Sequence, residues 1–286
     1  TVLTYLLGYV DDAIPRFLLG LVGGERAVGL LSMAGNVAGM LTDLLMGPFN
    51  EIAMNVVARL QTSRQMVKDL LDRVFNLTTA AIYPASLGLA AISPWLIPLL
   101  VGEEWTAAIL PLQIFLVLGI RDATGTFNIA ILRGVGDSRS PILILLIGVV
   151  LLCCLAPVFM PYGVSGIAAL IALRIFMTWP LSAWLVQRAA GYPALRQMMI
   201  GWRALLGSLG MLGAVLIVAG RLPQDLPDAA IIAVLVATGI ITYAGLMWFA
   251  GARQVQEIRD AFGWFRTHHD DGAEPVWPQT EMGTGL

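Results

Sequence analysis

Residues 5–23, YLLGYVDDAIPRFLLGLVG, place two carboxylates, a proline and a guanidinium among apolar side chains. Asp12 and Arg16 are four residues apart, so on a helix they share one face and can pair. Asp11 is rotated by about 100° from Asp12 and needs another partner or water. Carboxylates can hold a cation or a proton, and arginine can bind phosphate through forked hydrogen bonds. This segment is therefore a candidate site for binding ions or phosphate.

Further ionisable and amide side chains occur inside other apolar stretches. Arg121, Asp122 and Asn128 lie in GIRDATGTFNIAILRG, and Asp43 lies in a separate stretch. Arg174, in GIAALIALRIFMTW, has no acid three or four residues away, so its counter-charge must come from another stretch or from a ligand. The candidate cavity residues are Asp11, Asp12, Arg16, Asp43, Arg121, Asp122, Asn128 and Arg174.

Two interpretations of these residues remain open. In the first, they form internal ion pairs, with Asp11 or Asp43 bound to Arg174 and Asp122 bound to Arg121 or Arg16. In the second, they line a hydrated cavity. A charge at the centre of a bilayer costs about 2.5–3.5 kcal/mol on insertion scales, and buried pairs seldom stabilise more than apolar packing does. The second interpretation therefore accounts better for the whole set.

The composition identifies the kind of protein that must position these groups. Of the 286 residues, 58% are hydrophobic and 13% are charged, whereas a soluble domain has roughly 25% charged residues. The chain is therefore predicted to be an integral membrane protein. Its net charge is −2 and it has no basic run, which argues against nucleic acid as a partner. Neither Cys153-Cys154 nor His268-His269 has the spacing of a metal site, so no metal or cofactor is predicted.

The apolar runs predict an all-α, polytopic membrane bundle of about eight transmembrane helices. Breakers such as GGER, VGEEW and RLPQDLPD separate them. The expected spans are 2–22, 28–48, 74–99, 106–132, 141–160, 164–187, 204–220 and 229–250. Twelve of the 17 Lys and Arg residues fall in the alternate connections 59–73, 133–139, 188–203 and 253–266. By the positive-inside rule, both ends of this chain should be cytoplasmic.

Two segments are expected to lie along the membrane surface. Residues 62–75 mix charges with apolar residues one helical turn apart, and residues 252–267 form an amphipathic helix. The tail 268–286 is polar and rich in Pro and Gly, so disorder is predicted there. The start of the chain inside an apolar segment suggests that an N-terminal part is missing.

Several stretches resemble the polysaccharide-transporter family of O-antigen and exopolysaccharide flippases, whose superfamily also holds drug/sodium antiporters and the lipid II flippase. They are YVDDAIPRFLLGLVGGERAVGLLSMAGNV, GPFNEIAMNVVARLQ, YPASLGLAAISPWLIPLLVGEEWTAAILPLQIF, AILRGVGDSRSP and PYGVSGIAALIALR. They follow the family's order over roughly residues 5–190. Asp11 falls where the family commonly has Asp, whereas Asp12 replaces its usual Asn. Gly102 and Trp105 match a periplasmic loop.

The resemblance implies the second lobe of a two-lobed flippase in residues 1–190, with two additional helices in 191–251. It implies a membrane transporter, not an enzyme, in the bacterial inner membrane. Its substrate would be a polyprenyl-diphosphate-linked oligosaccharide for lipopolysaccharide or exopolysaccharide. Expected partners are membrane lipid, the missing N-terminal lobe and a glycan polymerase or export machinery. The alternatives are a multidrug/cation antiporter, a membrane glycosyl- or acyltransferase, and a non-transporting remnant.

Overall fold

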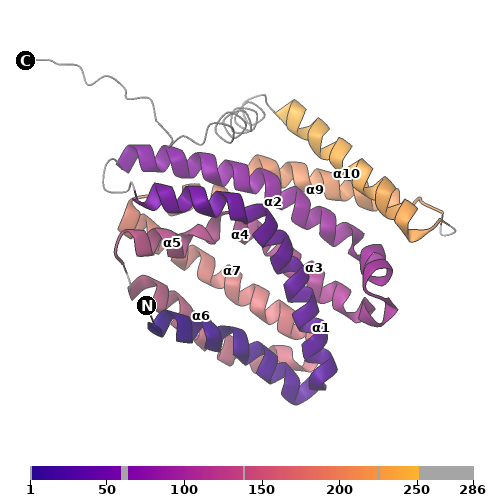
Figure 1. Cartoon of the computed structure of the whole chain (residues 1–286), viewed down its shortest axis with the longest axis horizontal. Helices are drawn as coiled ribbons and strands as arrows, with labels where there is room; N and C mark the ends of the chain where they lie inside the picture. The colour runs from indigo at the N-terminus through magenta and orange to yellow at the C-terminus, as the bar shows by residue number, and fades with distance from the viewer. Residues whose placement is uncertain (1, 59–63, 138, 224–225, 251–286) are drawn as a thin grey trace, which may run out of the picture.

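The computed structural model describes residues 2–58, 64–137, 139–223 and 226–250, and in these ranges it contains helices and connecting turns but no strand (Figure 1). The longer helices are α1 (Val2–Ala58), α2 (Arg64–Leu100), α6 (Arg139–Phe159), α7 (Gly163–Ala190), α9 (Trp202–Ala219) and α10 (Asp228–Ala250). The shorter ones are η1 (Glu103–Ala108), α3 (Ile109–Val117), α4 (Gly119–Gly125), α5 (Phe127–Gly134), η2 (Met160–Tyr162) and α8 (Ala194–Met199). The predicted all-α bundle is therefore confirmed.

Helix α1 consists of two arms that meet at Gly24. That residue has φ 70° and ψ −173°, a backbone conformation almost restricted to glycine. We call residues 2–23 the first arm and residues 25–58 the second arm. The chain turns back at Gly24, as the GGER breaker predicts, and the arms then face each other over part of their length (Figure 1). This turn brings the charged segment around Asp12 opposite the second arm.

Six apolar helical stretches in the described part of the chain are long enough to cross a membrane: Leu6–Gly47, Leu71–Leu100, Glu103–Gly134, Arg139–Ala190, Ala194–Ala219 and Asp228–Trp248. The first and fourth contain 42 and 52 residues. Each includes a break, at Gly24 or at η2. The chain is thus a multi-pass membrane protein, whereas the count of eight spans stays a prediction.

The helices pack into two connected groups. The first arm of α1 packs against α6 and α7 through Leu19, Leu152 and Ile167, whereas α9 and α10 pack on α2 through Leu87, Met211 and Leu235. Figure 1 shows the first group along its lower edge and the second along its upper edge. The predicted division at 190/191 stays a prediction.

Two helical segments differ in detail from the expectation. The span expected at 106–132 is present as the apolar stretch Glu103–Gly134, but it is divided into α3, α4 and α5, because Leu118 N–H bonds to the carbonyl of Phe115 in a tighter turn before Gly119. Residues 64–75 are not a separate surface helix but the first part of the uninterrupted α2, since Leu71 and Phe75 are buried in the core. The predicted surface helix at 252–267 and the tail at 268–286 lie outside the described residues.

Candidate functional site

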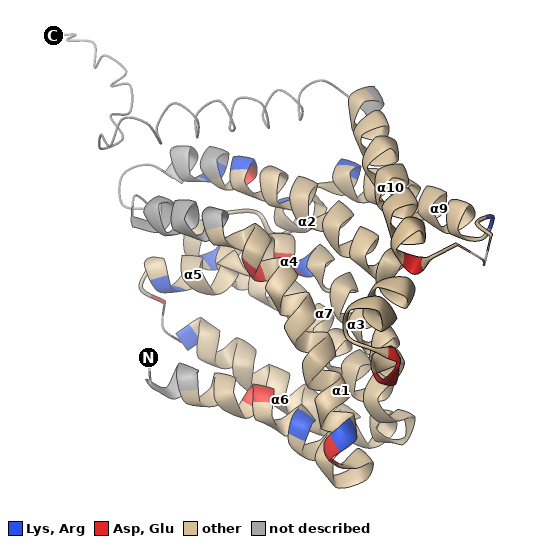
Figure 2. Ribbon diagram, turned by 45° about the vertical axis from the view of Figure 1, so that its right-hand side comes forward, with Lys and Arg blue, Asp and Glu red and all other residues tan. Residues whose placement is uncertain are grey.

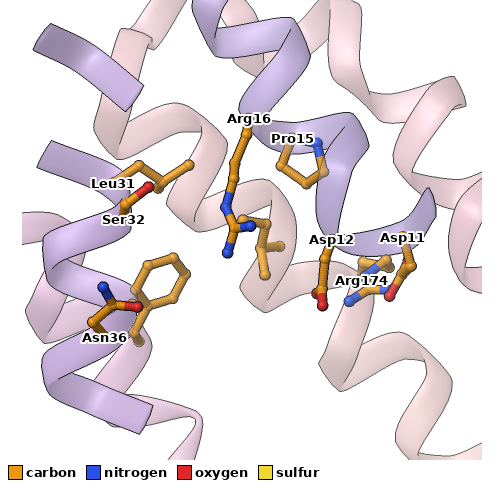
Figure 3. Close-up of a pocket in the computed structure, with 11 residues that line it drawn as sticks. Asp11, Asp12, Pro15, Arg16, Leu31, Ser32, Asn36 and Arg174 are labelled. Carbon is orange, nitrogen blue, oxygen red and sulfur yellow. The ribbon is translucent and has the colours of Figure 1, made fainter. Parts of the chain in front are cut away.

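A pocket of about 210 Å³ opens between the two arms of α1, with α3 and α7 closing its other sides (Figure 3). The turn at Gly24 creates it, because it folds the polar segment of the first arm against a small and polar part of the second arm. It is lined by Asp11, Asp12, Pro15, Arg16, Leu31, Ser32, Gly35, Asn36, Phe115, Ile171 and Arg174. Four of the eight candidate residues therefore line one pocket.

Asp11 is the acid that pairs with Arg174. The Nη1 group of Arg174 donates to both carboxylate oxygens of Asp11. The two side chains are 9% and 13% exposed, so the pair is largely withdrawn from solvent. Gly148 of α6 makes room for it, because a Cβ there would lie 3.1 Å from that Nη1 atom. The expectation that Arg174 finds its counter-charge on another segment is confirmed.

Arg16 and Asp12 have a different environment. Both are exposed, and in the described part of the chain neither takes part in an ion pair. The pair expected from their four-residue spacing is therefore not formed. Figure 3 shows the Arg16 side chain extending into the space between the arms, while Asp12 lies near Asp11 and Arg174. The pocket thus presents one guanidinium that no described carboxylate neutralises.

Neutral polar groups face this guanidinium from the second arm. Ser32 and Asn36 are one helical turn apart, and Figure 3 shows both on the side of the pocket opposite the first arm. Gly35, between them, lies against Phe115, where a Cβ would meet the ring at 3.7 Å. A hydroxyl and an amide beside a free guanidinium suit a ligand that carries both an anion and hydrogen-bonding groups.

Arg121 and Asp122 form their own ion pair outside the lining of this pocket. Their Nη1 and Oδ1 atoms are 3.0 Å apart, and both side chains are partly buried at the start of α4. Arg121 lies across Gly125, where a Cβ would approach its Nε to 2.7 Å. This is one of the two pairings considered for Asp122, and it leaves the cavity role of these residues a prediction.

Asn128 is fully buried in a polar cluster between helices. Its Nδ2 donates to Ser182 Oγ at 2.9 Å, and its Oδ1 accepts a hydrogen bond from Gln197 Nε2. Gln197 also donates to the carbonyl of Thr124 at 3.2 Å. Asn128 thus joins α5 to α7 and α8, away from the pocket. Sequence reasoning missed Ser182 and Gln197, since nothing in the spacing of two neutral residues so far along the chain indicates this contact.

Asp43 is exposed on the second arm and is not among the residues that line the pocket. In the described ranges it forms no ion pair. Its side chain therefore faces outward from the helices described.

Another cluster that the sequence did not reveal joins α8 to the start of α2. Asp72 accepts a hydrogen bond from the hydroxyl of Tyr192 at 2.5 Å and also pairs with Arg196. Burial, together with the hydrogen bond to the Asp72 carboxylate, raises the pKa of Tyr192 well above its ordinary value. These contacts anchor the connection between α7 and α9 at one end of the bundle.

Charged residues are sparse in the middle of the bundle and gather near its two ends (Figure 2). The connections at one end include Arg133, Arg139 and Arg188, whereas η1 at the other carries Glu103 and Glu104. This is the distribution that the alternation of basic connections predicted. The charges that line the pocket, together with Asp43, Arg121 and Asp122, are exceptions to this pattern because they lie within the apolar stretches.

Comparisons with known proteins find similarity to polysaccharide and lipopolysaccharide biosynthesis proteins in sequence and to membrane transporters in fold. A family model described as "Polysaccharide biosynthesis protein" matches residues 1–110, which hold both arms of α1 and the whole of α2. The lipopolysaccharide biosynthesis protein WzxC of Escherichia coli (strain K12) is 23% identical over 121 residues, which are 42% of this chain and 24% of WzxC. The chain therefore matches about a quarter of that relative's length.

Two solved structures align with most of the chain. A multidrug resistance MATE family transporter of the MOP superfamily, in an outward-facing conformation, has a TM-score of 0.54 at 20% identity, over 91% of this chain and 65% of its own. A MOP superfamily transporter from Pyrococcus furiosus has a TM-score of 0.49 at 20% identity, with the same coverage. The first alignment shows a shared fold. The family match and the WzxC relative confirm the resemblance found in the sequence, to the polysaccharide-transporter family, and the shared fold is consistent with it.

Proposed function

We propose that this chain is one lobe of a transporter that carries a polyprenyl-diphosphate-linked oligosaccharide, a precursor of lipopolysaccharide or exopolysaccharide, across the cytoplasmic membrane by alternating access. The observation that carries the proposal is the exposed Arg16 guanidinium in a polar pocket between two apolar helical arms. The polysaccharide family match over residues 1–110 supports the class of substrate.

The physical need for such a pocket follows from the substrate. A glycan joined to a diphosphate cannot cross hydrocarbon unaided, because its charges and hydroxyls would lose their water. Arg16 is suited to hold phosphate oxygens through charge-assisted hydrogen bonds. Ser32 and Asn36, on the facing arm, are suited to bind sugar hydroxyls. Asp12 and Asp43 remain candidates for binding a counter-ion or a proton.

A complete transport path needs a second lobe, because one lobe alone encloses no lumen across the membrane. The solved MATE transporter is longer than the part matched here, which covers 65% of it. We propose that an N-terminal lobe of the same protein faces the two arms of α1 and that membrane lipid contacts the apolar outer surface. Arg121, Asp122 and Asn128 would then lie deeper in the same lobe, and a glycan polymerase or export complex would receive the product.

The proposed location is the inner membrane, with both ends of the chain in the cytoplasm. The basic connections around Arg133 and Arg188 support this orientation by the positive-inside rule. The acidic turn at Glu103 and Glu104 would face the periplasm.

Multidrug or cation antiport is the second candidate function. The fold shared with a MATE family transporter is compatible with it, since one fold can serve different substrates. The specific observation in its favour is that two carboxylates, Asp11 and Asp12, line the same pocket as Arg16. A cationic drug would use Asp12, the carboxylate that no described cation neutralises, and would have no need of Arg16.

Replacing Arg16 by Gln in the complete protein separates these functions. We expect Arg16→Gln to lower surface glycan by roughly tenfold at equal protein levels, the scale of one lost charge-assisted hydrogen bond. Arg26→Gln is the matched control, because Arg26 is an exposed arginine of α1 outside the pocket. Normal glycan in Arg16→Gln cells would contradict the glycan proposal. Loss of drug resistance in Asp12→Asn cells with normal glycan would favour the antiporter, and normal behaviour of both variants would favour a remnant.

A further inference from the structure

We propose that the ligand's anionic group and Asp11 compete for Arg174, so that Arg174 passes from Asp11 to the ligand when the pocket fills. The inference rests on the proposed function, because it requires an anionic ligand beside Arg16. It assigns different roles to the two pocket arginines. Arg16 is the first contact for the anion, and Arg174 is a second cation held in reserve by a carboxylate of the protein.

The geometry of Arg174 suits such an exchange. Its side chain lines the pocket, yet only its Nη1 group is bonded to Asp11. Its Nε is buried and has no acceptor among the residues that the structure describes. A buried donor without an acceptor carries a desolvation penalty. Asp11 therefore accepts hydrogen bonds from only part of the Arg174 guanidinium. A ligand oxygen that also accepted a hydrogen bond from Nε would give the guanidinium a more complete set of partners.

The charges of the pocket point the same way. The lining holds two carboxylates, Asp11 and Asp12, and two guanidiniums, Arg16 and Arg174, so the net charge of the pocket is zero when both acids are ionised, although Asp12 and Arg16 do not form an ion pair. Each phosphate of a diphosphate that joins a lipid to a sugar carries a negative charge, so Arg16 alone matches only part of it. Recruiting Arg174 would supply the second guanidinium, and forked contacts from two arginines bind phosphate strongly.

The exchange would also change how the helices are held together. Asp11 belongs to the first arm of α1 and Arg174 to α7, and the pair packs against Gly148 of α6. Moving Arg174 from Asp11 to a ligand removes the ion pair between the first arm and α7. Binding of the anion would then loosen the arm that forms one wall of the pocket. The ligand would then bind more tightly to the arrangement of the lobe in which Arg174 has left Asp11 than to the arrangement in which the pair is intact. A ligand can shift a conformational equilibrium only through such a difference in affinity.

Binding of inorganic pyrophosphate to the purified complete protein tests the exchange. We expect Asp11→Asn to raise the affinity by about tenfold, because it frees Arg174 from its carboxylate partner. Asp12→Asn is the matched control, since it removes the same charge one residue away without releasing Arg174, and a smaller rise is expected. The rise caused by Asp11→Asn should vanish in the Arg174→Gln background, because no guanidinium is then released.

A second variant guards against loss of folding in Asp11→Asn, which leaves a buried arginine unpaired. Gly148→Ala keeps every charge and places a methyl group 3.1 Å from Arg174 Nη1 and 3.8 Å from Asp11 Oδ1. It should weaken the pair and raise the pyrophosphate affinity by a few fold.

The exchange is overturned if Asp11→Asn and Asp12→Asn raise the affinity equally, or if the rise persists without Arg174, since repulsion alone would then explain it. In that case the proposed function would still stand if the wild-type protein bound pyrophosphate and Arg16→Gln abolished that binding. Absence of pyrophosphate binding in all variants would overturn both proposals.

Discussion

Neighbouring carboxylates in this protein have different surroundings, and this difference determines what each can do. Asp11 is buried against Arg174, whereas Asp12, the next residue, is exposed in the pocket and has no cation partner among the described residues. A helix turns by about 100° per residue, so adjacent side chains necessarily face different neighbours. Asp11 can therefore hold helices together, and Asp12 remains available to a cation or a ligand.

The sequence identified these residues and included their partners among its alternatives, since it considered Asp11 or Asp43 for Arg174 and Arg121 or Arg16 for Asp122, but it did not decide between those alternatives. The four-residue spacing allowed a pair between Asp12 and Arg16, which does not form, whereas the pair between Asp11 and Arg174, 163 residues further along the chain, was one of two considered for Arg174. Spacing indicates which side chains share a face of one helix. It does not indicate which face another helix covers, and that depends on the turn at Gly24 and on the space left by Gly148.

Asn128 provides a prediction at the scale of single residues. Replacing it by Ala would remove the acceptor of one Gln197 N–H and the donor to Ser182 Oγ in the core, at a cost of about 1–3 kcal/mol, although both side chains keep a hydrogen bond to a backbone carbonyl. We expect Asn128→Ala to lower the thermal unfolding temperature of the purified protein. Asn36→Ala, in the exposed wall of the pocket, should leave that temperature nearly unchanged. An unfolding temperature that falls as much for Asn36→Ala as for Asn128→Ala would contradict the structural role.

The elements that create the pocket are the two arms of α1, and their arrangement depends on a single backbone conformation. The sequence GGER correctly predicted an interruption here, because two glycines beside charged residues rarely continue an apolar helix. The expected spans 2–22 and 28–48 imply that the chain turns back here, but they did not indicate that a pocket would form between the two arms. The sequence also did not reveal the breaks in the Glu103–Gly134 stretch. At one of them Gly119 packs so closely on Ser86 of α2 that a Cβ on Gly119 would lie 2.3 Å from the Ser86 hydroxyl. Such a contact between segments far apart in the sequence cannot be read from local spacing.

Gly24 gives a prediction at the scale of the elements. A Cβ at this position would meet no atom within 4 Å, so replacement by Ala adds only backbone strain, of order 1–3 kcal/mol. Gly29→Ala is the matched control, because Gly29 lies in the same helix, also in open space, with φ in the ordinary helical range. We expect Gly24→Ala to lower the unfolding temperature and to weaken pyrophosphate binding by displacing the first arm. Gly29→Ala should be neutral or slightly stabilising. Equal behaviour of the two variants would argue against a specific turn at Gly24.

At the scale of the whole molecule, the protein combines an apolar outer surface with a polar pocket between membrane helices. Side chains such as Leu44, Ile241 and Trp248 are exposed, as suits contact with lipid. The composition alone predicted this surface, because 13% charged residues are too few to cover a soluble domain. Where the charges meet could not be predicted, since the pocket joins residues of α1, α3 and α7.

The central claim is that the polar groups of the pocket border water rather than lipid. Its most direct test is labelling of single cysteines in intact cells with a membrane-impermeant thiol reagent, in a background with Cys153→Ala and Cys154→Ala. Cysteines should replace Asp12, Asn36 and, as a lipid-facing control on α6, the exposed Val150. We predict that positions 12 and 36 of the complete protein react and that addition of pyrophosphate slows their reaction, while position 150 stays unlabelled. Failure of both pocket positions to react from either side of the membrane, or labelling of position 150 at the same rate, would contradict the account.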